Sequence, residues 1–237
     1  MKSMRYIEKS NTNLRCLDAH RAFPRNNFDN LPGDCKTEIR NMLLKEQGFL
    51  CAYCMNRISN EWNSTIKKFK TEIEHFYSQE LHPDKVLQYN NMLAVCNGFY
   101  LENGKSETHC DKTKDGKVIG TSVLRKLNPT HPLCEAQLKC SVSGDIKSIN
   151  NDPDVEFDIN DMLNLNAKQL KANRRLVIDV VARRLKELIK TVPANQPLRK
   201  TLLNKEIKYW LGEKEQKLKP FCQVAVWFLE KRMNNAI

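Results

Sequence analysis

Four of the nine cysteines have the order and spacing of a structural zinc site. Cys51 and Cys54 are separated by two residues, and Cys96 and Cys110 follow later in the chain. A C-x-x-C pair lets two thiolates reach one ion, and two further thiolates complete the tetrahedral coordination that zinc prefers. We therefore expect a four-cysteine zinc site. Thirteen residues lie between Cys96 and Cys110, where a second C-x-x-C pair would have two. We therefore expect an insertion between these two ligands.

Two alternatives to this ligand set remain open. His109 is next to Cys110 and could replace one cysteine as a ligand, and the four cysteines could instead be buried thiols without a metal. We expect the remaining cysteines to be ordinary thiols, namely Cys16, Cys35, Cys134, Cys140 and Cys222.

Polar residues suited to phosphodiester hydrolysis lie among these cysteines. Glu74 and His75 are adjacent, and Asp111 directly follows Cys110. Hydrolysis of a phosphodiester needs a general base for water and a divalent cation that neutralises charge on the phosphate and the leaving oxygen. Carboxylates are the ligands that hard ions such as Mg²⁺ and Mn²⁺ prefer. A Glu-His pair alone commonly lies on a protein surface without a catalytic role. Between zinc-binding cysteines, however, it predicts a catalytic site.

In this arrangement the sequence resembles the HNH (ββα-metal) endonucleases, whose pattern has Asp-His on a strand, Asn before the third cysteine and a metal ligand after the fourth. The resemblance implies that His75 activates water and that Glu74 and Asp111 hold a catalytic Mg²⁺ or Mn²⁺. It also implies that Asn91 orients the histidine through its main chain. Glu74 replaces the usual Asp, and Asp111 replaces the usual Asn or His, which makes the site more anionic. Asn97 is an alternative to Asp111 as the last ligand.

A narrower resemblance is to the PtuB-type HNH nucleases of Septu and retron anti-phage systems, and it covers about residues 35–185. Its implied partner is a PtuA-like ABC-type ATPase. The resemblance is carried by the segments 50–54 (LCAYC), 73–76 (IEHF), 89–96 (YNNMLAVC), 109–112 (HCDK) and 163–166 (LNLN).

The net charge of +11 is concentrated near the C-terminus. Residues 1–164 carry 22 Lys and Arg against 22 Asp and Glu, whereas residues 165–237 carry 17 against 6. A neutral region joined to a basic one favours contact with a polyanion or an acidic protein through the basic part, although a solvated surface is the alternative. DNA is the expected polyanion, with RNA possible, and the resemblance favours the ATPase as the partner of the basic region. The candidate contact residues are Arg174, Arg175, Arg183 and Arg184, with Lys112 and Lys114 beside Asp111 as candidate phosphate contacts.

Length and composition limit the fold and the location. A chain of 237 residues with 41% hydrophobic residues can form one domain with an appended lobe or two small domains. The start of the chain lacks the apolar run of a signal peptide, and nothing approaches the length of a transmembrane helix. We expect a cytoplasmic protein without a membrane partner, in which clustered cysteines bind metal rather than form disulfides.

The periodicity predicts an α+β fold with flanking helices, and the resemblance implies that its core is of the ββα-metal type. We expect an irregular N-terminal arm (1–34), a nuclease core (35–150) and a basic helical region (151–237). Within the core, Asp34 is a candidate N-cap of a helix to about Gln47, a knuckle at 49–58 leads into a short strand, and 71–76 alternates as a strand. A hairpin is expected at 137–149 and helices at 167–190, 197–211 and 220–233.

Two other functions remain open. A zinc-ribbon module that binds nucleic acid without cleaving it has no need of Glu74, His75 and Asp111 together, so these residues distinguish it from an enzyme. A nuclease acting on structured RNA such as tRNA is the second alternative.

Overall fold

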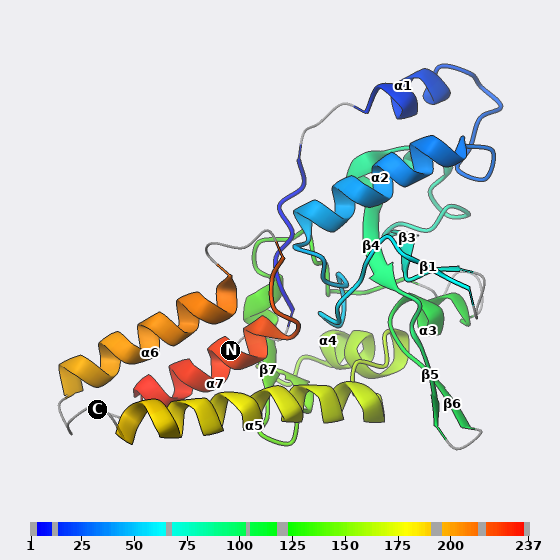
Figure 1. The fold of residues 1–237 in the computed structure, drawn as a ribbon. Coiled ribbons are helices and arrows are strands. Elements are labelled where there is room, and N and C mark those ends of the chain that lie inside the picture. The colour runs from blue at the N-terminus through cyan, green and yellow to red at the C-terminus, as the bar shows by residue number, and fades with distance from the viewer. Residues whose placement is uncertain are drawn as a thin grey trace.

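The computed structural model describes residues 4–10, 14–64, 68–102, 105–117, 123–190, 196–212 and 217–234. The described chain is a mixed α+β fold with short antiparallel strand pairs (Figure 1), so the α+β class is confirmed. Helices α1 (Arg15–Arg21) and α2 (Gly33–Glu46) lie at one end of the molecule, and three C-terminal helices lie at the other. Within the described ranges, no helix has the length and apolar character needed to cross a membrane.

The centre of the fold is a strand pair covered by a helix. Strands β3 (Thr71–His75) and β4 (Met92–Cys96) pair antiparallel, and α2 (Gly33–Glu46) packs against both. Strand β4 is apolar in four consecutive residues because both of its faces are buried. Buried Gln47 fixes the end of α2 to this strand. Its Nε2 donates to the Ala94 carbonyl at 2.7 Å, and its Oε1 accepts from the Ala94 amide at 2.8 Å.

The segments flanking β3 and β4 carry the cysteines. The knuckle after α2 ends in a single bridge between Leu50 and Arg57 rather than the predicted strand. The expected insertion after Cys96 contains a hairpin formed by β5 (Phe99–Glu102) and β6 (Lys105–Thr108). It begins at Gly98, whose φ of +57° and close approach to the His109 carbonyl leave no room for a Cβ. Helix α3 (Asp111–Asp115) then starts directly after Cys110.

The predicted hairpin at 137–149 is confirmed as β7 (Leu138–Cys140) and β8 (Ile146–Ser148). After it come α4 (Pro153–Phe157) and the π-helical turn η4 (Asp158–Met162). Asp158 is fully buried, and its carboxylate accepts the main-chain N–H groups of residues 125, 126 and 127 at 2.7–2.8 Å. This contact joins the turn to the segment ahead of the hairpin.

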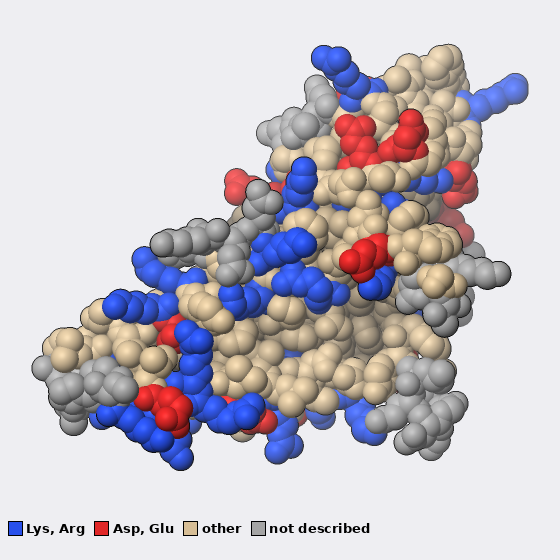
Figure 2. Space-filling view, viewed as in Figure 1, with Lys and Arg blue, Asp and Glu red and all other residues tan. Residues whose placement is uncertain are grey.

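The predicted C-terminal helices are confirmed as α5 (Lys168–Lys190), α6 (Gln196–Leu211) and α7 (Cys222–Asn234). Helix α7 packs against both of the others, and the segment from Phe221 to Leu229 is buried throughout. The buried face of α5 consists of Leu170, Arg174, Ile178, Val181 and Leu185. In Figure 2, Lys and Arg side chains gather over these three helices, and Asp and Glu are more frequent towards the opposite end.

The N-terminal arm is more regular than expected. It contains α1 (Arg15–Arg21), and α2 begins at Gly33, ahead of the predicted cap Asp34. Cys16 of α1 forms a disulfide with Cys35 of α2, so the prediction that these two are ordinary thiols is wrong. Their Cα atoms lie 5.8 Å apart, and this proximity depends on α1, which the sequence pattern did not predict. The remaining short elements are β1 (Trp62–Asn63), β2 (Lys68–Phe69), η1 (Pro83–Lys85), η2 (Tyr89–Asn91) and η3 (Cys134–Gln137).

Candidate metal centres

A cavity of about 520 Å³ opens between β3, the segment that follows it and α3. Glu74, His75 and Asp111, the predicted catalytic residues, all line it, together with Lys114 and Asp115. Carboxylate oxygens of Glu74, Asp111 and Asp115 lie within 4.8 Å of one another. Asp115 was not predicted. Asp111 and Asp115 are four residues apart in a helix, a spacing that places both side chains on one face.

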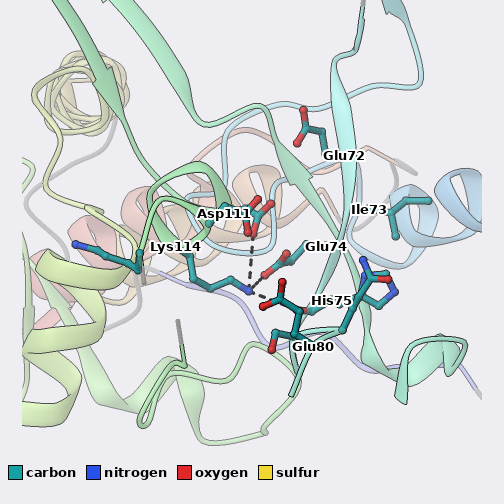
Figure 3. A pocket seen from close by; sticks show the side chains of 11 residues that line it. Glu72, Ile73, Glu74, His75, Glu80, Asp111 and Lys114 are labelled. Atoms are coloured by element: carbon teal, nitrogen blue, oxygen red, sulfur yellow. Dashed lines mark hydrogen bonds and ion pairs between the residues drawn. The ribbon is translucent and has the colours of Figure 1, made fainter. Parts of the chain in front are cut away.

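Glu74 is held from two sides. Buried Tyr53 donates from its hydroxyl to Glu74 Oε1 at 3.1 Å, and the Lys114 ammonium forms an ion pair with the same oxygen. Lys114 Nζ also lies 3.8 Å from Asp111 Oδ1, so it points between the two carboxylates (Figure 3). Burial alone would lower the pKa of Lys114, but the charges of Glu74 and Asp111 outweigh it and raise that pKa. Lys114 is therefore charged at neutral pH.

Asp111 is a buried carboxyl group with an oxygen atom left unsatisfied by the described residues. Burial, followed by the charge of Glu74, raises the pKa of Asp111 to about 9. Its Oδ1 is buried and receives no hydrogen bond from any described residue. One ammonium therefore does not satisfy these three carboxylates. A hard divalent cation would fit the oxygen ligands that Glu74, Asp111 and Asp115 offer.

His75 is fixed by a main-chain acceptor. Its Nε2 lies 2.9 Å from the Val86 carbonyl oxygen, and the edge of its ring packs on Phe28 with centroids 4.6 Å apart. A carbonyl oxygen can only accept, so Nε2 carries the proton and Nδ1 of the neutral ring keeps its lone pair. Burial lowers the pKa of His75 from its ordinary value. The ring is therefore neutral at pH 7 and can accept a proton at Nδ1.

Asn91 secures the segment around His75. Its main-chain oxygen accepts from the Phe76 amide at 2.9 Å, and its side-chain oxygen accepts from the Tyr77 amide at 2.8 Å. Its Nδ2 donates to the carbonyls of Tyr77 at 3.0 Å and Lys85 at 3.2 Å. Lys85 precedes Val86, the partner of His75. Asn91 thus fixes the chain on both sides of the imidazole, by its side chain as well as by the expected main chain.

The four predicted zinc cysteines come together beside this pocket. All four sulfur atoms lie within 4.8 Å of one another, with Cys51 and Cys110 Sγ 3.9 Å apart and Cys54 and Cys96 Sγ 3.7 Å apart. Two thiolates bound at about 2.3 Å to one tetrahedral zinc lie roughly 3.8 Å apart. The cluster therefore has the size of a Cys₄ zinc site.

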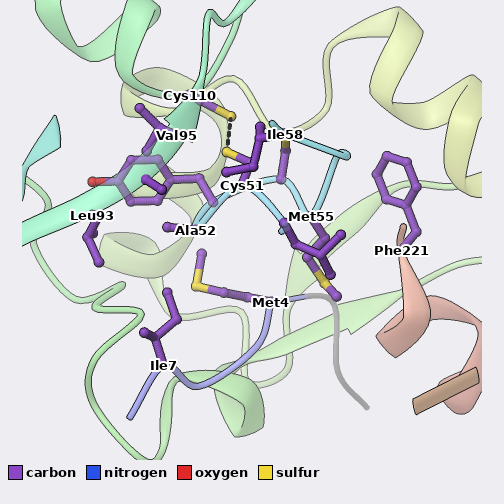
Figure 4. Packing of buried hydrophobic residues seen from close by; sticks show 14 of the residues in the cluster. Met4, Ile7, Cys51, Ala52, Met55, Ile58, Leu93, Val95, Cys110 and Phe221 are labelled. Atoms are coloured by element: carbon purple, nitrogen blue, oxygen red, sulfur yellow. Dashed lines mark hydrogen bonds between the residues drawn. The ribbon is translucent and has the colours of Figure 1, made fainter. Parts of the chain in front are cut away.

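The surroundings of the cluster are apolar and tightly packed. Cys51 lies among Met4, Ala52 and Met55, and Phe221 lies just beyond them (Figure 4). Burial alone would raise the pKa of the Cys51 thiol, but hydrogen bonds from Cys110, Cys54 and Cys96 outweigh it and lower that pKa. The other thiols thus stabilise a thiolate at Cys51. A dication bound at the centre of the cluster would stabilise more of the four cysteines as thiolates.

The alternative ligands are not part of either group. His109 Nδ1 lies 3.2 Å from Cys110 Sγ, which places it beside the cluster, but it is outside the set of four mutually close ligand atoms. Asn97 does not line the carboxylate cavity. The Leu163–Asn166 segment holds Cys110 in place. The Cys110 amide donates to the Leu163 carbonyl at 2.7 Å, and Asn164 Nδ2 donates to the Thr108 carbonyl at 2.7 Å.

Comparison with models of known protein families finds no match, and comparison with curated proteins finds no relative.

The predicted phosphate and partner contacts divide into buried and exposed residues. The prediction is wrong for Arg174, which is 1% exposed and donates to the carbonyls of Gly144 at 2.9 Å and Leu165 at 2.6 Å. Arg184 forms a bidentate pair with Glu206 of α6, at 2.6 and 3.1 Å. Lys114 is 3% exposed and is engaged by Glu74, so it is not a surface phosphate contact. Lys112, Arg175 and Arg183 are exposed, and so is Arg184 in spite of its pair with Glu206.

Proposed function

We propose that this protein is a divalent-metal-dependent endonuclease of the HNH type that hydrolyses nucleic-acid phosphodiester bonds. The observation that carries the proposal is the convergence of Glu74, Asp111 and Asp115 in a cavity that His75 also lines, next to four cysteines at zinc spacing. The resemblance in the sequence favours DNA as the substrate, and RNA is the alternative.

The residues have separable roles in this proposal. Glu74, Asp111 and Asp115 would hold Mg²⁺ or Mn²⁺, which neutralises charge on the phosphate and the leaving oxygen. His75, neutral and with its Nε2 proton engaged by the Val86 carbonyl, would take a proton from water at Nδ1. Tyr53 orients Glu74, and Asn91 holds the chain around His75. The four cysteines would hold a structural zinc that fixes β4 and the start of α3 together.

A zinc-ribbon module without catalytic activity explains these features less well. Such a module needs its zinc ligands and a basic surface, but no buried carboxylates. Burying Glu74 and Asp111 beside each other costs stability unless a cation compensates them. Three carboxylates around one cavity are therefore better explained by a function that uses them.

The test is cleavage of labelled duplex DNA, single-stranded DNA and RNA by purified protein whose zinc content has been measured. We expect cleavage with Mg²⁺ or Mn²⁺, its loss in a mild EDTA wash that leaves the zinc in place, and its recovery on adding either ion back. Cleavage that persists in EDTA would overturn the divalent-ion mechanism. Binding of all three substrates without cleavage in any metal would favour the zinc-ribbon module.

We further propose that the nuclease acts in bacterial anti-phage defence with a PtuA-like ABC-type ATPase. The support is the PtuB-type resemblance together with the exposed Arg175 and Arg183 on α5. Replacing both by Glu should abolish co-purification with the ATPase if α5 docks it. If these arginines contact DNA phosphates instead, the complex survives, and the slope of log affinity against log salt falls by roughly 0.9 for each lost contact.

A further inference from the structure

The Lys114 ammonium lies beside two of the carboxylates that would bind a metal ion in this cavity. Its ammonium forms an ion pair with Glu74 Oε1, lies 3.8 Å from Asp111 Oδ1, and donates to the His75 carbonyl at 3.4 Å. The side chain is 3% exposed, although Lys112 on the same short helix is exposed. Residues two apart in a helix point about 200° apart, so Lys114 alone of this pair turns inward.

The charges around Lys114 do not balance. Glu74, Asp111 and Asp115 provide three carboxyl groups within 4.8 Å of one another, and one ammonium lies among them. Asp111 Oδ1 is left buried without a hydrogen bond from the described residues. One ammonium cannot pair with all three carboxyl groups, whereas one divalent ion could be bound by all three. A divalent ion bound by Glu74 would compete with the ammonium for the charge of this carboxylate.

We propose that Lys114 is a displaceable internal cation that holds the carboxylates together when no metal is bound and is expelled when a divalent ion enters. The adjoining cavity of about 520 Å³ provides space for the released side chain. An ammonium released into this cavity would remain available to a substrate phosphate bound at the metal. The inference rests on the proposed metal site and adds a regulation of that site.

The first test compares Mn²⁺ binding by calorimetry in wild type, Lys114→Met and Lys112→Met. Both variants lose one positive charge on α3, so Lys112→Met corrects for the general electrostatic effect. Removing a competing charge a few ångströms from the ion should tighten Mn²⁺ binding in Lys114→Met by about tenfold or more relative to Lys112→Met. Equal or weaker binding in Lys114→Met overturns the inference and leaves the proposed nuclease standing. If no variant binds Mn²⁺ at millimolar concentration, the metal site itself is wrong.

The second test uses the wild-type chain and does not depend on a variant folding. Acetylation of individual lysines by an amine-reactive reagent is followed by mass spectrometry with and without Mn²⁺, with zinc retained. Lys114 should react slowly in the metal-free protein and several times faster with Mn²⁺, while the rate at Lys112 stays unchanged. A Lys114 rate that does not respond to a Mn²⁺ concentration that calorimetry shows to be saturating overturns the displacement.

Discussion

Replacing His75 by Ala separates chemistry from folding in this site. The Ala side chain lacks the imidazole Nδ1 that would take a proton from water. Removing a positioned general base typically lowers the rate by about 10²- to 10⁴-fold. The structural cost is smaller. Among the described residues, the ring has a hydrogen bond to Val86 at 2.9 Å and a T-shaped contact with Phe28. Leaving the buried carbonyl unpaired costs about 1–3 kcal/mol, less than the 5–15 kcal/mol that typically stabilises a domain.

His82→Ala is the matched control. His82 belongs to the same segment after β3 and packs its ring on Tyr77 with centroids 5.0 Å apart, but it does not line the carboxylate cavity. Initial cleavage rates are measured at saturating Mn²⁺, with zinc content and melting temperature recorded for each variant. His75→Ala should keep its zinc, fold, and cleave at least about 10² times more slowly than His82→Ala.

The pH profile gives a second readout of the same residue. Burial lowers the pKa of His75, and a base acts when it is deprotonated. The wild-type rate should therefore fall with decreasing pH through an inflection below 6.5, the ordinary histidine value, and His75→Ala should lack that inflection. Cleavage by His75→Ala within tenfold of the control, with the inflection retained, would refute the assignment of His75 as the base.

Three further predictions concern the cysteines and Asp111. Structural zinc contributes roughly 10–16 kcal/mol in small domains, so Cys54→Ser should lose both zinc and solubility in an expression and metal-content assay; a soluble, zinc-loaded variant would contradict the Cys₄ site. The pKa of Asp111 is raised to about 9, and this carboxyl group must lose its proton to bind a metal ion. Calorimetry should therefore show Mn²⁺ affinity rising with pH from 6.5 to 8.5, by up to about tenfold per pH unit. An affinity that does not change with pH would contradict Asp111 as a metal ligand. The Cys16–Cys35 disulfide closes a sequence separation of 19 residues, and Cys16→Ser should lower the free energy of unfolding by roughly 3 kcal/mol in denaturant titrations without changing zinc content; unchanged stability would argue against this bond.

Local patterns were sufficient to predict much of the fold. The β7–β8 hairpin and helices α5, α6 and α7 follow from alternation, turn residues and helical spacing that each segment carries within itself. The C-x-x-C pair and the residues beside Cys96 and Cys110 likewise predicted the cysteine cluster. Asp115 could have been found in the same way, since it lies one helical turn after Asp111.

Other features depend on tertiary contacts that no local pattern contains. Arg174 and Arg175 are equivalent in sequence, but Arg174 faces the hairpin turn and is buried by the carbonyls of Gly144 and Leu165. Lys114 differs from Lys112 in the same way, because its direction on α3 brings it to Glu74. The disulfide requires α1, which is only seven residues long and has too little periodicity to be predicted.

The most direct test of a metal-dependent nuclease at this cavity is the cleavage rate of Asp111→Asn in Mn²⁺, compared with Asp145→Asn. Asn has nearly the same size as Asp but lacks its charge. Asp145 is a half-buried aspartate of the β7–β8 turn that pairs with Lys171 at 2.6 Å. It does not line the cavity. A catalytic ion supplies several kcal/mol of transition-state stabilisation, and each 1.4 kcal/mol is about tenfold in rate. Asp111→Asn should therefore cleave at least about 10² times more slowly than Asp145→Asn while both keep one zinc per chain. Equal rates in the two folded variants would contradict catalysis at this site.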